Sequence, residues 1–316
     1  MKTELTDTTS SKVNAALLEA RRSIGMPTLG MVLTLVIVTD EENAYDAVKA
    51  ASDASREHPC RIIAVIKRQG RAHRRLNQTR LDAELRVGTD AGTGEIIMLR
   101  LHGELTRHAG PVVLPLLLPD APVVAWWPAD APEDLGRDDL GRLAQRRITD
   151  AYTALDSVAE LAARGASYAP GDTDLAWTRL TPWRSLLAAA LDQRPVSVTG
   201  AAVESEADNP SAELLACWLE DRLGVPVERV VTPGPVVTRV RLATAGGEIT
   251  VDRPSGALAT LGVPGQPDRR VALKIRSTAE LISEELRRLD ADDTYAAALR
   301  RLSRQAAAAA PAVSTR

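Results

Sequence analysis

Two of the chain's five tryptophans lie in one short stretch together with two arginines, GDTDLAWTRLTPWR at residues 171–184. Aromatic residues are scarce elsewhere, since they make up 3% of the chain and phenylalanine is absent. Tryptophan and arginine are enriched among the residues that contribute most to protein–protein binding. The stretch therefore predicts a domain junction or a docking surface, with plain core packing as the alternative.

The two tryptophans of this stretch are expected to have different surroundings. The Thr-Pro pair at 181–182 is typical of a helix start, because the hydroxyl caps the helix and proline fits its first turn. Trp183 lies on the apolar stripe of that helix and is expected in the core of the second domain. Trp177 precedes the proline and does not share the stripe, so we expect it at the junction or outside, with Arg179 or Arg184 beside it.

A second pair, Trp126 and Trp127, closes the apolar run APVVAWWP at residues 121–128. Adjacent side chains on a strand point to opposite faces. One ring can enter a core, whereas the other must meet a helix, a domain boundary or a partner. The C-terminal ends of strands are also where open α/β sheets bind ligands. A small-molecule site between the domains, beside this pair, is therefore the alternative to docking, either in a binding protein or in an enzyme.

Other residue types that carry chemistry form no recognisable set. None of the four histidines lies in an HExxH motif, and no cysteine and histidine spacing is that of a zinc site. No serine lies in GxSxG. Cys60 and Cys217 are far apart in the chain and are expected to be small buried core residues. We therefore predict no catalytic residue, no metal and no cofactor.

Three segments are candidates for contact with phosphate or a dinucleotide. GTDAGTG at 88–94 is followed by a strand pattern and has no lysine, so a hairpin turn is favoured over a phosphate loop. TDEEN at 39–43 lacks the glycines of a dinucleotide fold. KRQGRAHRRLNQTR at 67–80 is the one basic cluster, and it indicates a solvated loop or a contact with phosphate or an acidic protein patch.

Periodicity predicts an α/β chain with a mixed sheet in its first half. Residues 32–38 and 60–66 are continuous apolar runs, typical of strands covered on both faces, and a helix at 41–57 between them makes the strands parallel. Alternation at 81–87 and 95–101 predicts an antiparallel hairpin. The other predicted helices are 13–20, 104–118, 153–164, 181–191, 211–224 and 278–302, and the other predicted strands are 121–128, 196–200 and an antiparallel set across 227–275.

Length and composition narrow the class of protein. A chain of 316 residues is long enough for two domains. A net charge of −3 argues against a nucleic-acid binder. The longest apolar run, Met31 to Val38, is far short of the roughly 20 residues that a membrane helix needs. The polar N-terminus and the two isolated cysteines predict a reduced, cytoplasmic setting.

Four segments together resemble the OpcA family, described as glucose-6-phosphate dehydrogenase assembly proteins of actinobacteria and cyanobacteria. They are ASREHPCRI at 54–62, VVAWWP at 123–128, LAQRRITDA at 143–151 and GDTDLAWTRLTPWRSLLAAALDQ at 171–193. The resemblance implies a non-catalytic protein that binds the dehydrogenase and promotes its active oligomer, at the entry to the oxidative pentose phosphate pathway. It implies no particular contact residues.

These observations combine into one prediction of organisation and function. We expect an N-terminal mixed α/β domain at 1–170, a C-terminal α+β domain at 171–304 and a disordered alanine-rich tail at 305–316. The partner is expected to be the dehydrogenase, with no nucleic acid and no membrane. The residues predicted to contact it are Trp126, Trp127, Trp177, Arg179 and Arg184.

Overall fold

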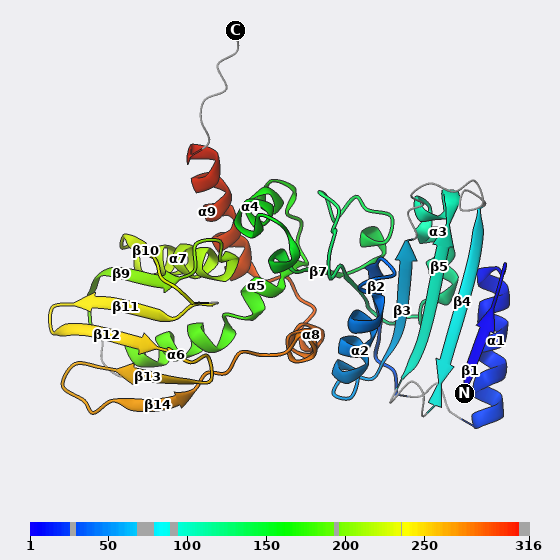
Figure 1. Ribbon diagram of the computed structural model, residues 1–316, viewed down its shortest axis with the longest axis horizontal. Helices are drawn as coiled ribbons and strands as arrows, with labels where there is room; N and C mark the ends of the chain where they lie inside the picture. Colours follow the sequence, from blue (N-terminus) through cyan, green and yellow to red (C-terminus); the bar gives the residue numbers. More distant parts are fainter. Residues whose placement is uncertain (26–29, 68–78, 89–93, 193–195, 235, 310–316) are drawn as a thin grey trace, which may run out of the picture. The chain divides into compact units, whose positions relative to one another are not determined.

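The chain forms two compact units that interleave along the sequence (Figure 1). The N-terminal unit comprises Met1–Asp150, Ala169–Thr173 and Ser277–Ala291, and the C-terminal unit comprises Ala151–Tyr168, Asp174–Arg276 and the residues from Asp292 onward. The chain thus crosses between the units more than once, whereas we expected a single division at residue 170. The computed structural model describes residues 1–25, 30–67, 79–88, 94–192, 196–234 and 236–309.

The N-terminal unit is built on an eight-stranded mixed sheet with the order β1-β4-β5-β3-β2-β6-β7-β8. The five adjacent strands β5, β3, β2, β6 and β7 are parallel to one another, while β4 pairs antiparallel with both β1 and β5. The bounds are β1 Lys2–Leu5, β2 Leu33–Thr39, β3 Cys60–Lys67, β4 Arg80–Val87, β5 Glu95–His102, β6 Val123–Trp126, β7 Arg146–Thr149 and β8 Asp172–Asp174.

Helices cover the centre of this sheet, as its continuous apolar strands require. Every residue of β2 is buried. Val36 and Val38 share a core cluster with Val13 and Leu17 of helix α1, and helix α2 packs on β2, β3 and helix α8. Figure 1 shows α2 and α8 side by side. The helices of this unit are α1 Ser10–Ile24, α2 Ala44–Ala54, α3 Ala109–Val113 and α8 Thr278–Arg287.

The central prediction for this unit is confirmed, and two details differ. β2 and β3 are parallel, and β4 and β5 form the expected antiparallel pair. The turn residues 89–93 and the basic residues 68–78 lie outside the described part of the chain. The helix predicted at 104–118 is wrong as one element. Because Pro111 and Pro115 interrupt backbone hydrogen bonding, the segment divides into two 3-10 turns flanking the five-residue α3.

The C-terminal unit contains a six-stranded sheet with the order β10-β9-β11-β12-β13-β14. Strands β11 to β14 form the expected antiparallel set, but β10 pairs parallel with β9 because α7 connects them. The strands are β9 Val198–Ser205, β10 Val227–Val231, β11 Arg239–Thr244, β12 Gly247–Asp252, β13 Leu258–Gly262 and β14 Arg269–Ala272, and the helices are α4 Ser157–Ser167, α5 Leu175–Thr178, α6 Thr181–Asp192, α7 Pro210–Leu223 and α9 Asp293–Ala309.

The long helix predicted at 278–302 is instead two helices that belong to different units. α8 ends at Arg287, and Asp292 begins α9 by accepting the backbone N–H groups of Thr294 and Tyr295 at 2.9 and 3.0 Å. α9 continues to Ala309, so residues 305–309 of the predicted disordered tail are helical. Alanine has the strongest helix propensity, which explains the extension. Residues 310–316 lie outside the described part.

Candidate functional site

The stretch 171–184 contains strand β8, the short helix α5 and the start of α6. Asp174 is buried and caps α5, since its carboxylate accepts the backbone N–H of Ala176 at 2.8 Å and that of Ala151 at 3.0 Å. Because the Asp174 carboxylate accepts hydrogen bonds from two backbone N–H groups, it fixes the orientation of α5 at its N-terminus. That helical turn directs the side chain of Trp177 inward.

Trp177 lies in the core of the C-terminal unit, only 2% exposed. Its indole Nε1 donates to Oδ2 of Asp292 at 2.8 Å, and its ring lies 5.8 Å from that of Tyr295. The Arg184 guanidinium stacks on the ring at 3.6 Å. The expectation that Trp177 lies at the junction or outside is therefore wrong, because α5, a four-residue helix without a periodic sequence signal, turns it into the core.

Asp292 connects this tryptophan to the start of α9. Burial opposes ionisation of its carboxyl group, but several interactions outweigh it and lower its pKa. These are the N–H of Tyr295, the Trp177 indole, the charge of Arg184 and the N–H of Thr294. One carboxylate therefore fixes the tryptophan and caps the helix at the same time.

Trp183 lies in the same core cluster and is also 2% exposed, so its predicted position is confirmed. The two arginines of the stretch are half-buried. Arg179 stacks on the ring of Tyr152 at 4.6 Å, and Arg184 donates to Oγ1 of Thr181 at 3.1 Å in addition to its contact with Trp177. Of the stretch's Trp and Arg side chains, only the arginines reach the surface of the unit.

Trp126 and Trp127 are both buried in the N-terminal unit. Trp127 belongs to the core cluster under the sheet, and its backbone N–H donates to the carbonyl of Ile148 at 2.9 Å. Neither indole Nε1 has a hydrogen-bond partner among the described residues. The two rings, each at most 2% exposed, therefore contribute packing, and neither presents a face to solvent.

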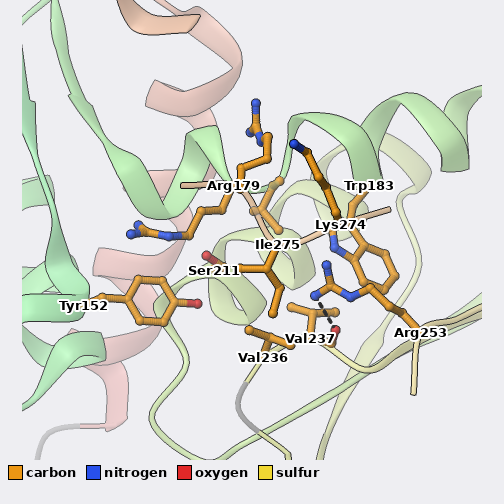
Figure 2. Close-up of a pocket in the computed structure, with 11 residues that line it drawn as sticks. Tyr152, Arg179, Trp183, Ser211, Val236, Val237, Arg253, Lys274 and Ile275 are labelled. Atoms are coloured by element: carbon orange, nitrogen blue, oxygen red, sulfur yellow. Dashed lines mark hydrogen bonds between the residues drawn. The ribbon is translucent and has the colours of Figure 1, made fainter. Parts of the chain in front are cut away.

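A cavity opens beside the same stretch of the C-terminal unit (Figure 2). It encloses about 390 Å³, including its open mouth. Four cationic side chains line it, and no acidic side chain does so in the described part of the chain. The lining residues are Tyr152, Arg179, Leu180, Trp183, Ser211, Val236, Val237, Arg253, Lys274, Ile275 and Arg276.

Arg253 is the most buried of these cations, with 6% of its surface exposed. Its Nη1 donates to the carbonyl of Leu273 at 3.1 Å and its Nη2 to that of Val237 at 2.9 Å. The guanidinium also stacks on Trp183 at 4.9 Å. Its Nε has no partner among the described residues, and burial lowers its pKa. Sequence reasoning missed this residue, which directly follows the strand β12.

The two cysteines are buried, as predicted from the sequence. Burial raises the pKa of each thiol to about 12, and for Cys217 the nearby carboxylates of Glu220 and Glu213 add to the effect. A thiol with such a pKa is a poor nucleophile at neutral pH. The described residues contain no group of three or more His, Cys, Asp or Glu side chains that could hold a metal ion. None of their helices is long and apolar enough to cross a membrane.

Two family models match the chain in order and together reach from residue 51 to 299. Residues 51–166 match the glucose-6-phosphate dehydrogenase subunit N-terminal domain, and residues 170–299 match the C-terminal domain of that subunit. No curated protein matches the chain.

Solved structures resemble the chain only weakly. An oxidoreductase from Sinorhizobium meliloti is 12% identical, with a TM-score of 0.44 over 87% of this chain and 89% of that one. An inositol dehydrogenase homolog from Azotobacter vinelandii, complexed with NADH and myo-inositol, is 8% identical, with a TM-score of 0.31 over 65% of this chain and 72% of that one. Similarity at this level supports no statement about function.

Proposed function

We propose, from the premise that this chain belongs to the OpcA family of glucose-6-phosphate dehydrogenase subunits, that it binds this dehydrogenase and promotes its active oligomer. The observation that supports the proposal is the extent of the family match, from residue 51 to 299. Both units contain matched residues, so the family match is not confined to one of them.

The proposed role is that of a non-catalytic activator. The carboxylates described above cap helices or pair with arginines, and both thiols are buried with raised pKa values. These groups stabilise the fold, and none is placed as an activated nucleophile. An activator of this kind acts at the entry to the oxidative pentose phosphate pathway, in the cytoplasm and without nucleic acid or membrane as partners.

We place part of the contact with the dehydrogenase at Arg179 and Arg184. Each is half-buried and stacks on an aromatic ring, Tyr152 or Trp177, which limits the entropy it loses on binding. Arginines held in this way are typical of residues that contribute strongly to binding. The buried Trp177 then acts only by supporting Arg184, while Trp126 and Trp127 are buried in the N-terminal unit and contribute packing there.

Mixing the purified chain with the dehydrogenase tests the proposal. We expect a stable complex in size-exclusion chromatography and an increase in the initial rate of the dehydrogenase reaction. The double variant Arg179→Ala/Arg184→Ala should weaken the complex by about 2 kcal/mol or more, as for a pair of hot-spot residues. The matched control is Arg269→Ala/Arg270→Ala, which removes the same charge from exposed positions on β14 and should bind normally.

Two results would contradict the proposal. Neither complex nor rate change with the unaltered chain would remove the activator function. A normal complex with Arg179→Ala/Arg184→Ala would remove only the assigned contact. The alternative function, a small-molecule binding protein or enzyme near Trp126 and Trp127, has less support because both rings are buried.

A further inference from the structure

One buried arginine of the C-terminal unit has no acidic partner. Arg253 forms no ion pair in the described part of the chain, and its Nε atom has no hydrogen-bond partner. The other interactions of its guanidinium are with two neutral carbonyl groups and the ring of Trp183. Since arginine stays protonated in proteins, a full positive charge is buried here without neutralisation.

The other buried arginines show that the absence of an acidic partner is unusual in this molecule. Each of the five that are described is in contact with a carboxylate: Arg21 and Arg61 with Glu95, Arg146 with Glu285, Arg147 with Asp172, and Arg164 with Glu160. Burying a charge is costly unless it is paired, so an exception requires an explanation. An anion that binds from solution would provide the missing partner.

The surroundings of Arg253 fit an anion of more than one charge. Arg179, Lys274 and Arg276 line the same cavity, and they come from different parts of the chain. Arg179 lies between α5 and α6, whereas Lys274 and Arg276 follow β14. Figure 2 shows Arg253 and Trp183 close together at one side of the cavity. Cationic donors that converge from separate segments are the usual means of binding phosphate.

We propose that this cavity binds the phosphate group of a small phosphorylated molecule, with Arg253 as the buried counter-charge. A phosphate monoester carries close to two negative charges at pH 7, which suits four cations better than a single carboxylate does. Leu180, Val237 and Ile275 provide apolar walls beside the cations and would contact the rest of the molecule.

This site shares Arg179 with the contact proposed for the dehydrogenase, but phosphate binding does not require the dehydrogenase to be present. It is tested on the purified full chain alone, so its failure leaves that proposal untouched, and the reverse also holds. The probes are inorganic phosphate and glycerol 3-phosphate, with acetate as the carboxylate arm, all at constant ionic strength. Binding is measured by isothermal titration calorimetry and by the shift in thermal unfolding temperature.

Saturable binding of one phosphate or one glycerol 3-phosphate per chain is expected, and acetate should bind at least tenfold more weakly. Tighter binding of glycerol 3-phosphate than of phosphate would identify the ligand as an ester, whereas equal binding would identify free phosphate. Lys274→Gln removes an exposed cation from the lining and should weaken binding about tenfold, as for one charge-assisted hydrogen bond. Arg253→Gln should abolish binding.

Arg239→Gln is the matched control, because it removes one positive charge from a pair with Asp252 on the neighbouring strands β11 and β12. It should bind phosphate as the unaltered chain does. If Arg253→Gln does not fold, the phosphate affinity of Lys274→Gln still tests whether the cations of this cavity bind phosphate. Absence of saturable phosphate binding, equal binding in Lys274→Gln and Arg239→Gln, or acetate binding as tight as phosphate binding would each overturn the proposal.

Discussion

Two buried arginine sites, the Glu95 cluster of the N-terminal unit and Arg253 of the C-terminal unit, are built in different ways, although another buried arginine of the C-terminal unit, Arg164, is paired with Glu160. In the N-terminal unit, Glu95 is 2% exposed and pairs with both Arg21 and Arg61, so each buried cation has an acidic partner supplied by the fold. In the C-terminal unit, Arg253 is also buried, and within the described part of the chain its guanidinium contacts two carbonyl groups and the ring of Trp183 but no carboxylate. The charges of Arg21 and Arg61 are neutralised by a carboxylate of the chain itself. The charge of Arg253 is not, and we propose that a ligand neutralises it.

This comparison distinguishes buried arginines that stabilise the fold through ion pairs from a buried arginine that can bind an anion. A buried ion pair gains little over an apolar pair, but removing one partner is strongly destabilising. A buried cation without a partner already carries that cost in the folded state. Changes to the two regions should therefore have different effects on stability.

Glu95→Gln should have the largest effect, because it leaves two buried arginines without a counter-charge. We expect a loss of about 3–5 kcal/mol in the free energy of unfolding. The measurement is denaturant unfolding followed by circular dichroism, with hydrogen exchange of β2 and β3 to assign the loss to this unit. Glu104→Gln, in an exposed pair with Arg107, is the control and should change stability by less than about 1 kcal/mol. Equal effects of the two substitutions would show that the buried ion pairs of Glu95 stabilise the fold no more than an exposed ion pair does.

Trp183→Ala tests how the C-terminal unit holds its arginine. The ring is 2% exposed and stacks with Arg253, so its removal leaves a cavity next to a buried charge. A loss of about 3–5 kcal/mol is expected, the usual range for an aromatic truncation. Thermal and denaturant unfolding give the value, and Leu155→Ala, at a fully exposed position, is the control. A loss below about 1 kcal/mol would contradict the assigned packing.

Asp292→Asn should lower the free energy of unfolding by less than Trp183→Ala does, and the size of this loss should depend on pH. The folded-state pKa of Asp292 is lowered, so its carboxylate stabilises the fold above the unfolded value of about 3.9, and this contribution is lost as the pH falls below it. At pH 7 we expect a loss of about 1.5–3 kcal/mol, the range for a hydrogen-bonded charge. Unfolding measured between pH 7 and pH 3 should show the variant and the unaltered chain converging at low pH. A difference that stays constant with pH would contradict the role of the charge.

Arg253→Met should have the smallest effect of the four when no anion is present. The substitution removes two hydrogen bonds to carbonyl groups but also removes a buried charge that lacks a partner. The net loss is expected to be about 1 kcal/mol or less, because replacing a buried charge by an apolar side chain is often neutral. Denaturant unfolding in phosphate-free buffer gives the value. A loss as large as that of Glu95→Gln would show that Arg253 is a structural residue like the paired arginines.

Where a segment is apolar and periodic, its sequence was enough to predict the fold. The parallel pair β2 and β3 with α2 between them followed from two continuous apolar runs, and α6 followed from its Thr-Pro start. The strands β7 and β8 were missed because RRIT and DTD are polar, although both are buried. Their burial depends on Arg147 meeting Asp172 and on Arg146 meeting Glu285, far along the chain. Ion pairs between residues so far apart in the chain leave no pattern in the local sequence from which the strands could be predicted.

The candidate site was predictable only in part, for a similar reason. The stretch 171–184 was recognised by its residue types, but the position of Trp177 depends on the four-residue helix α5 and on Asp292 from another segment. A weak signal for Arg253 does exist. Ile249 and Val251 are buried on β12, and the same alternation predicts that Arg253, one position past the end of the strand, is buried too.

The central functional claim is that this chain promotes the active oligomer of glucose-6-phosphate dehydrogenase. The most direct measurement is sedimentation velocity of the dehydrogenase at increasing amounts of this chain, with the reaction rate recorded on the same mixtures. We expect a larger species that contains both proteins, together with a rate that rises in proportion to that species and saturates with it. An unchanged sedimentation profile and an unchanged rate, at concentrations where both proteins are folded, would contradict it.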